Sequence, residues 1–135
     1  GKLVWSWEPE PLHPGQPKPA NLIPNGPSIH KGAVYIDTTD GRFFALSMET
    51  GKEIWVSRPT ESTCCDTGFV AAHEGAVIAE TDVTSPGECG RCNTVRALNS
   101  STGVQLWEFK PDNPVWDLMV QFPGDGTIVF QDITG

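Results

Sequence analysis

The sequence contains no long hydrophobic run. No stretch approaches the roughly 18 consecutive apolar residues that a membrane-spanning helix needs, so no transmembrane segment is expected. Basic residues are also scarce, with 9 Lys and Arg against 17 Asp and Glu and a formal net charge of -8. Because a surface that follows a nucleic-acid backbone needs clustered positive charge, we do not expect nucleic acid as a partner.

Several recognisable functional patterns are missing as well. The first residues do not have the pattern of a secretory signal peptide, and Gly1 is not preceded by Met, so we expect a processed or partly represented chain. Asn93 follows the second cysteine of Cys89-Gly90-Arg91-Cys92 where haem attachment requires histidine. No G-x-S-x-G nucleophile elbow is present, and the histidines are scattered: His13, His30 and His73. No catalytic residue and no metal site are predicted.

The four cysteines form an adjacent pair, Cys64 and Cys65, and a spaced pair, Cys89 and Cys92. An even number favours disulfides in an oxidising compartment, with a zinc site or reduced thiols as the alternatives. Adjacent cysteines are sterically poor at binding one zinc ion together, although sulfur ligation suits zinc. The sequon Asn99-Ser100-Ser101 is compatible with a secretory route. We therefore predict an extracytoplasmic location: secreted, periplasmic or in an organelle lumen.

Proline is concentrated in residues 9–27, and this segment is predicted to be an extended connection, because proline removes backbone donors and fixes φ. The pattern then changes to short β-rich runs separated by turns such as Asp40-Gly41. These runs lie at 33–39, 42–48 and 53–57. They predict a meander of short antiparallel strands.

The same order of segments then returns. Residues 74–82 resemble 31–39, residues 94–100 resemble 42–48, and a third copy begins at 125–135. Two copies share five identical positions: Ala45, Leu46, Thr50, Gly51 and Trp55 recur as Ala97, Leu98, Thr102, Gly103 and Trp107. Repeats of this length made of four strands are typical of β-propeller blades.

The repeats predict an all-β fold of consecutive four-stranded propeller blades. The expected parts are an outer strand of a preceding blade (1–8), the Pro-rich connection (9–27), a first full blade (28–58), a second full blade (59–110) with a cysteine-containing insertion (83–92), and the start of a further blade (111–135). Closed propellers have about four to eight blades, so the propeller is incomplete in this chain. We expect a protein partner, or the remainder of a longer polypeptide, to complete it.

The recurring tryptophans are predicted to be packing residues. In such a unit the small Ala45 or Ala97 lets a neighbouring sheet approach, the Thr-Gly turn reverses the chain, and the tryptophan covers the gap between blades. Because a buried tryptophan contributes a large apolar area, this structural role is preferred over stacking on a cofactor. The predicted docking residues are Trp5, Trp55 and Trp107.

At these residues the chain resembles the pyrroloquinoline-quinone (PQQ)-type repeat of quinoprotein-like β-propellers, whose pattern is A-L-x-x-x-T-G-K-x-x-W after a D-G hairpin. The first copy, from Ala45 to Trp55, matches the pattern fully, and the second has Val104 in place of the lysine. The resemblance covers residues 1–8 and 28–135. It implies the fold, whereas the family includes both PQQ-dependent alcohol dehydrogenases and non-catalytic scaffold propellers.

The adjacent cysteines resemble a second feature of the PQQ alcohol dehydrogenases. Cys64, Cys65 and Asp66 match the place where those enzymes form a strained disulfide ring that packs on the quinone, which implies PQQ with calcium as cofactors. The chain continues with Thr67-Gly68-Phe69 where those enzymes have Asn-Arg-Gly. The preferred hypothesis is a non-catalytic scaffold or assembly segment without a cofactor. The alternative is a fragment of a PQQ-dependent alcohol or sugar dehydrogenase.

Two further expectations concern individual side chains. We expect the cysteines to be oxidised and to hold residues 58–93 together. A Cys89–Cys92 bridge is favoured because it closes a short loop that contains Gly90, and a Cys64–Cys65 bridge is expected beside it although it requires unusual peptide geometry; crossed pairing between the two sets is the competitor. Four carboxylates are placed at strand ends, where turn and solvated-edge roles are preferred over acid-base catalysis or calcium binding. These are Asp37, Asp40, Glu80 and Asp82.

Overall fold

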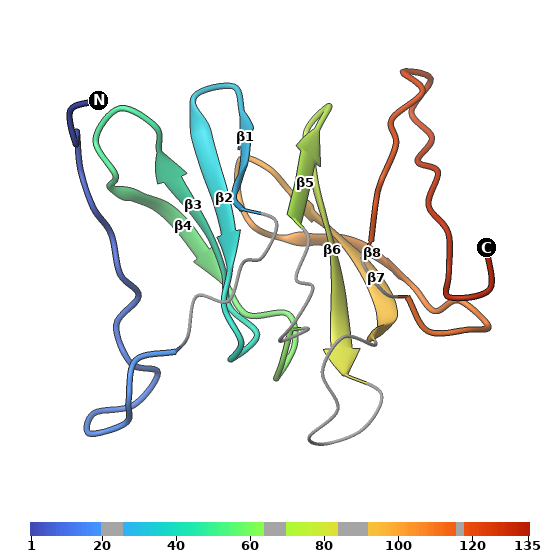
Figure 1. The fold of residues 1–135 in the computed structure, drawn as a ribbon, viewed down its shortest axis with the longest axis horizontal. Helices are drawn as coiled ribbons and strands as arrows, with labels where there is room; N and C mark the ends of the chain where they lie inside the picture. The colour runs from blue at the N-terminus through green and yellow to red at the C-terminus, as the bar shows by residue number, and fades with distance from the viewer. Residues whose placement is uncertain (20–25, 64–69, 84–91, 116–117) are drawn as a thin grey trace.

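The fold consists of β-strands, and the described residues contain no helix (Figure 1). The computed structural model describes residues 1–19, 26–63, 70–83, 92–115 and 118–135. The strands are β1 (Ser28–His30), β2 (Ala33–Asp37), β3 (Phe43–Ser47), β4 (Glu53–Ser57), β5 (Val70–His73), β6 (Ala76–Val83), β7 (Cys92–Asn99) and β8 (Gln105–Phe109). The all-β prediction is confirmed.

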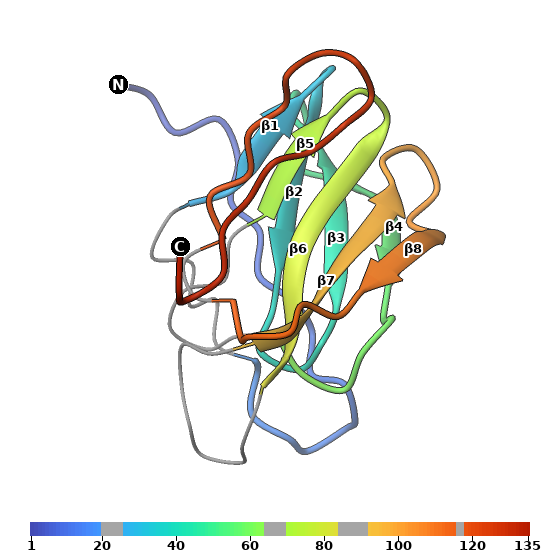
Figure 2. The ribbon, with the colours of Figure 1, turned by 90° about the vertical axis from the view of Figure 1, so that its right-hand side faces the viewer.

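The strands form two four-stranded antiparallel sheets in which every strand pairs with its neighbour in sequence. Sheet one has the order β1-β2-β3-β4 and sheet two the order β5-β6-β7-β8. The sheets stand face to face, with the N-terminal segment beside sheet one and the C-terminal segment beside sheet two (Figures 1 and 2). This arrangement is that of consecutive propeller blades, so the chain forms part of a β-propeller.

The innermost hairpins have a turn geometry that their sequence explains. Lys31 and Gly32 between β1 and β2 have φ of 47° and 80°, and Glu74 and Gly75 between β5 and β6 have φ of 46° and 88°. Two successive residues with positive φ form the turn that matches the twist of antiparallel strands, and glycine at the second position adopts it without strain. The same residue pattern therefore builds the same turn in both sheets.

The outer hairpins share an irregularity. The register of β3 and β4 shifts between Ala45 and Leu46, and that of β7 and β8 shifts between Ala97 and Leu98. Before the shift, Ala45 pairs with Trp55. A bulge increases local twist, and here it lies next to a tryptophan in each sheet.

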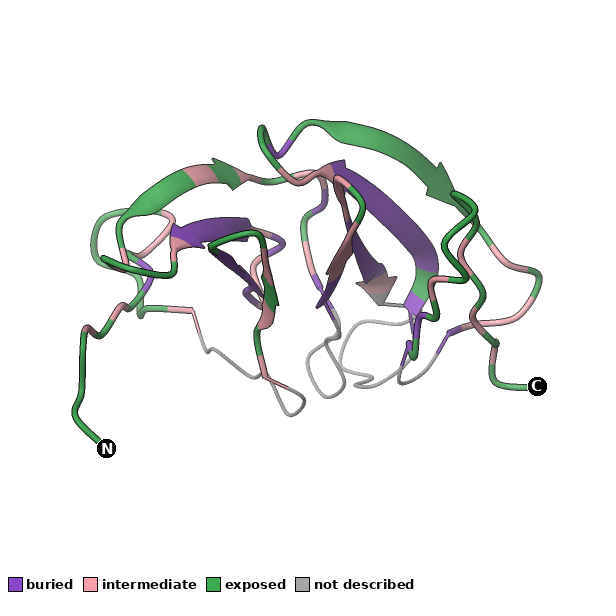
Figure 3. Ribbon diagram, turned by 90° about the horizontal axis from the view of Figure 1, so that it is seen from above, coloured by how far each residue is buried: buried purple, intermediate pink, exposed green. Residues whose placement is uncertain are grey.

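Three apolar layers hold the sheets together. The layer between the two sheets contains buried residues of both, including Tyr35, Phe43, Val77 and Leu98. The other face of sheet one packs against Trp5 and Trp7 of the N-terminal segment, and the other face of sheet two packs against Val115 and against apolar residues between Leu118 and Phe130. Burial is greatest in β2, β3, β6 and β7, whereas β4 and β8 are largely exposed (Figure 3). The sheets are therefore stacked radially.

Candidate functional site

The contacts made by the recurring tryptophans are the first candidate site. The Trp5 indole Nε1 donates a hydrogen bond to the Met48 carbonyl oxygen at 2.9 Å. Its ring covers Gly51, where an added Cβ would lie 2.7 Å from Trp5 Cδ2. Gly51 also has a φ of 71°, so its conformation and the close approach of the ring both require glycine.

Trp55 repeats this contact between the two sheets. Its Nε1 donates to the Ser100 carbonyl oxygen at 2.9 Å, and an added Cβ at Gly103 would lie 2.6 Å from Trp55 Cε3. Tyr35 donates its hydroxyl to the same Ser100 oxygen at 3.2 Å, with its ring centroid 6.0 Å from that of Trp55. A tryptophan on one unit therefore binds the Thr-Gly turn of the next unit.

Trp107 occupies the corresponding position in sheet two but has no such contact. It pairs with Ala97, as Trp55 pairs with Ala45, and 38% of its surface is exposed. Among the described residues, its indole has no hydrogen-bond acceptor of the kind that Met48 and Ser100 supply. The face of β8 that bears Trp107 is therefore an open counterpart of the contact between the sheets.

The repeat pattern predicted Trp5, Trp55 and Trp107 as packing residues but did not identify Trp7. This residue packs edge-on against Phe44, with ring centroids 4.7 Å apart, and donates to Glu53 Oε1 at 3.0 Å. The alternation of Trp5, Ser6 and Trp7 is the signal that was available, because alternate residues of an extended segment face the same side.

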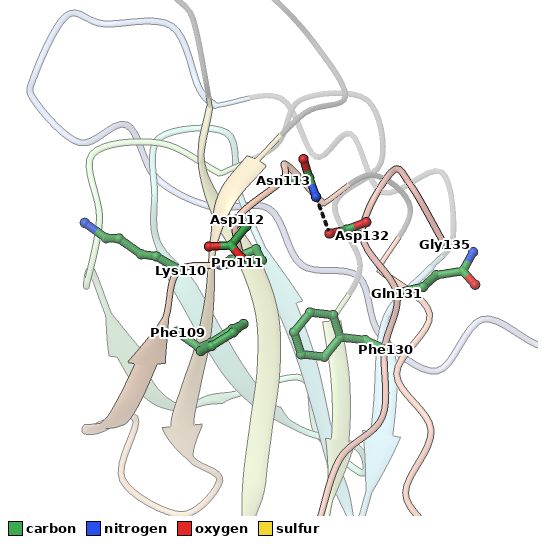
Figure 4. A pocket seen from close by; sticks show the side chains of 9 residues that line it. All are labelled: Phe109, Lys110, Pro111, Asp112, Asn113, Phe130, Gln131, Asp132 and Gly135. Carbon is green, nitrogen blue, oxygen red and sulfur yellow. Dashed lines mark hydrogen bonds between the residues drawn. The ribbon is translucent and has the colours of Figure 1, made fainter.

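An open cleft lies beside the exposed face of β8, between the end of β8 and the C-terminal segment (Figure 4). Its volume is about 560 Å³, and its lining combines Phe109 and Phe130, with ring centroids 6.1 Å apart, with polar side chains. Asn113 Nδ2 donates to Asp132 Oδ2 at 3.0 Å. Hydrogen bonds from Thr134 and Asn113 lower the pKa of Asp132, which keeps this carboxyl ionised. The cleft is therefore part apolar and part charged, with Lys110 beside Asp112 and Asp132 in its lining.

Ion pairs stabilise the end of the sheets at which β2 ends and β3 begins. Arg42 Nη2 lies 2.8 Å from Asp40 Oδ2, and Arg42 also donates to the Glu10 carbonyl oxygen at 2.7 Å. The pKa of Asp40 is lowered, because hydrogen bonds from Arg42 and Thr38 outweigh the raising effect of burial. Asp40 thus stabilises its own turn and orients Arg42, which binds the Pro-rich segment.

Arg96 is the centre of a second ionic group. It is 9% exposed and donates to Thr81 Oγ1 at 3.0 Å, Gln105 Oε1 at 2.9 Å and Asp82 Oδ2 at 2.7 Å. Asp82 also accepts a hydrogen bond from Thr60 and has an unusual φ of 62°. Burial would raise the pKa of Asp82, but bonds from Thr60, Arg96 and Thr94 lower it. These contacts join three strands of sheet two.

The expectation of a solvated strand edge is wrong for Asp37 and Glu80. Asp37 is the last residue of β2, and Glu80 lies at the corresponding position of β6. Their exposed fractions are 3% and 1%. Burial raises the pKa of Asp37 to about 6. The neighbouring sheet and the segment after β4 cover these positions, which local sequence does not reveal.

Two histidines that looked scattered in the sequence lie together. His30 ends β1, His73 ends β5, and their ring centroids are 5.7 Å apart. His73 also stacks on Phe122 at 4.8 Å and lies 3.4 Å from Glu74 Oε1. The sequence offered one signal for this pairing, because both histidines directly precede the inner turns at equivalent positions of the repeat. His13 is in the Pro-rich connection.

Most of the predicted cysteine sites lie outside the described residues, namely Cys64, Cys65 and Cys89. Cys92 is buried and disulfide-bonded, and its backbone exchanges hydrogen bonds of 3.0 and 2.7 Å with Val115. Within the described ranges, no three His, Cys, Asp or Glu side chains are grouped to hold a metal ion. The cofactor position suggested for Cys64 and Cys65 stays a prediction. No helix in that part of the chain is long and apolar enough to span a membrane.

The stacked sheets and their tryptophan contacts define a PQQ-type β-propeller repeat. The family model that matches residues 1–130 is described as outer membrane protein assembly factor BamB. The chain belongs to this family of PQQ-type propeller repeats.

Curated relatives include quinoprotein dehydrogenases. Quinohemoprotein alcohol dehydrogenase of Comamonas testosteroni is 26% identical over 98% of this chain and 17% of its own length. Quinohemoprotein alcohol dehydrogenase ADH IIB of Pseudomonas putida is 30% identical over 81% of this chain and 16% of its own length. The chain therefore spans about a sixth of these relatives.

Solved structures agree on the fold. The Comamonas testosteroni enzyme has a TM-score of 0.52 at 28% identity, covering 65% of this chain and 13% of that one. BamB from Moraxella catarrhalis has a TM-score of 0.50 at 22% identity, covering 64% and 24%. Both an assembly factor and a dehydrogenase thus share this arrangement of sheets.

Proposed function

We propose that this chain is a non-catalytic propeller segment that acts as a scaffold or assembly unit of a larger extracytoplasmic protein or complex. The observation on which the proposal rests is the open face of β8. Two tryptophans, Trp5 and Trp55, bind the Thr-Gly turn of the next unit, whereas Trp107 is exposed at the matching position. The proposed role of the segment is therefore to hold adjoining propeller units through this repeated contact.

The polar side chains support a structural role. Asp40 is bound by Arg42 and Thr38, and Asp82 is bound by Arg96 and Thr60. A carboxylate that already accepts several hydrogen bonds and has a lowered pKa is a poor proton acceptor. Asp40 and Asp82 thus stabilise turns and sheets.

The proposed location follows from the cysteines and the family. Cys92 is disulfide-bonded, and disulfides persist mainly in oxidising compartments. The family description names an outer membrane protein assembly factor. We propose Cys89 as the partner of Cys92, because the pair closes a short loop that contains Gly90.

A dehydrogenase fragment is the second candidate. The similarity to the quinohemoprotein alcohol dehydrogenase of Comamonas testosteroni extends over 98% of the chain, which includes Cys64, Cys65 and Asp66. In this case the two cysteines would face PQQ in the complete protein.

One experiment separates the two candidates. The full-length protein is incubated with PQQ and calcium, and alcohol-dependent reduction of a dye is followed. A scaffold gives no turnover and no retained quinone after gel filtration. Sustained turnover that is lost when both adjacent cysteines are replaced by serine would refute the scaffold proposal.

A further inference from the structure

Asp37 is a carboxyl group with too few hydrogen-bond donors around it. It is 3% exposed, and its backbone pairs with Phe43 in the ladder of sheet one. Its Oδ1 is buried and has no hydrogen-bond partner among the described residues. An ionised carboxylate at this position would therefore lack the donors that a buried charge needs.

Thr63 contacts this carboxyl from the connector, residues 58–63, which leaves β4 and passes between the sheets. Its side chain donates to the Thr38 carbonyl oxygen at 2.8 Å and is also hydrogen-bonded to Asp37. A hydroxyl group has one proton to donate and can accept further bonds. Both contacts exist together only when a protonated Asp37 donates to Thr63 and Thr63 donates to Thr38.

The arginines at this end of the sheets are already engaged. The carboxylate oxygens of their partners lie 2.7–2.8 Å from them, in the pairs Arg42–Asp40, Arg58–Glu61 and Arg96–Asp82. Glu80, the buried acid at the corresponding position of β6, adds no positive charge. Burial is the main cause that raises the pKa of Asp37 to about 6, and bonds from its own backbone amide and Thr63 act in the opposite direction.

The connector is the element that can yield. Asp37 itself is held by the ladder of sheet one. Within the described residues, the connector is joined to sheet two by the bridge between Thr63 and Thr81, by the Thr60 side chain, which donates to Asp82, and by the Asp82 amide, which donates to the Ser62 oxygen at 3.3 Å. Near the surface, Arg58 Nε also donates to the Asp40 carbonyl oxygen at 2.9 Å. Loss of the bond from Thr63 to Thr38 would leave the connector without its buried hydrogen bond to sheet one.

We propose that Asp37 and Thr63 form a proton-dependent latch that fastens the connector to sheet one. In the neutral form, Asp37 donates to Thr63 and Thr63 donates to Thr38, so every proton has an acceptor. On ionisation, the Thr63 proton turns to the carboxylate, Thr38 loses its donor, and water must reach Oδ1. The connector then loosens as the pH rises, and the contact between the sheets becomes pH-dependent.

Amide hydrogen exchange of the full-length protein tests the latch. Protection factors, corrected for the intrinsic effect of pH on exchange, are measured from about pH 4 to mildly alkaline pH for the connector and for Asp82, whose amide bonds to it. In the wild type, protection falls as the pH rises from the ordinary carboxyl pKa of 3.8 to the raised value of about 6 and then levels off, by about a hundredfold in total, because each pKa unit corresponds to tenfold in the coupled equilibrium. Asp37→Asn, which cannot ionise, abolishes this step.

Variants of the connector distinguish a latch from a general effect of pH. Thr63→Val removes the hydroxyl and the step, whereas Thr63→Ser keeps both. Thr60→Val is the matched control, since Thr60 binds Asp82 and not Asp37; it lowers protection at every pH and leaves the step in place. A step that persists in Asp37→Asn or in Thr63→Val overturns the proposal, as does a wild type without one.

Discussion

Replacement of Gly103 by alanine tests the contact between the sheets most directly. The new Cβ would lie 2.6 Å from Trp55 Cε3, and Gly103 has a φ of 72°. Alanine in this conformation costs about 1 kcal/mol. Displacement of the ring costs about 1 kcal/mol for its hydrogen bond to Ser100 and about 1 kcal/mol for lost packing. We expect Gly103→Ala to lower the free energy of unfolding by about 3 kcal/mol in total.

Gly75→Ala is the matched control, because Gly75 has a φ of 88° but an added Cβ would meet nothing within 4 Å. It retains the conformational cost of about 1 kcal/mol and has no clash. Urea unfolding of the full-length protein, followed by tryptophan fluorescence, gives both values. Equal losses in the two variants would show that Trp55 does not depend on the close approach at Gly103.

Three further predictions follow from the same contacts. Trp55→Phe removes the hydrogen bond to Ser100 and should lower the free energy of unfolding in urea by about 2 kcal/mol. Trp7→Phe should lower it by less than about 1 kcal/mol, because the Trp7 indole binds an exposed Glu53; similar losses in the two variants would argue against a special role for the sheet contact. Arg96→Met should cost about 3 kcal/mol, because it leaves a partly buried Asp82 without its cation, and a value near zero in thermal unfolding would contradict the role assigned to Arg96. The pKa of Asp82 is lowered in the folded state, so its contribution to stability is present above the unfolded-state value of 3.8 and is lost as the pH falls through the folded-state pKa. Arg96→Met removes one cause of this lowering, so acidification should remove less stability from the variant than from the wild type; equal losses between neutral and acid pH in urea unfolding followed by circular dichroism would refute this.

Much of the fold was predictable because its signals are local and repeated. The glycines at 32 and 75, each after a residue with positive φ, fix the inner turns, and alternating apolar runs fix the strands. The repeat from Ala45 to Trp55 also identified tryptophans whose partners lie 43 and 45 residues away. Repetition revealed these long-range contacts because the same residues recur in each unit.

The remaining features depend on packing between segments that no local pattern relates. The burial of Asp37 results from the connector crossing over it, and the pairing of His30 with His73 results from the approach of two inner strands. Neither is visible in strand periodicity. The division of the chain into blade units, the pairing of Cys64 and Cys65, and their relation to a cofactor stay predictions.

The spacing of the tryptophan contacts has a consequence for biosynthesis. Sheet one can form its own ladders once Ser57 has been made, but Trp55 must wait for Ser100, which lies 45 residues further along the chain. At about 5–20 residues per second, this delay lasts a few seconds during translation. Throughout that interval an apolar face with a tryptophan is uncovered on the nascent chain. Each new unit thus shields the one before it while exposing its own face, so the order of synthesis sets the order in which the growing protein becomes safe from aggregation.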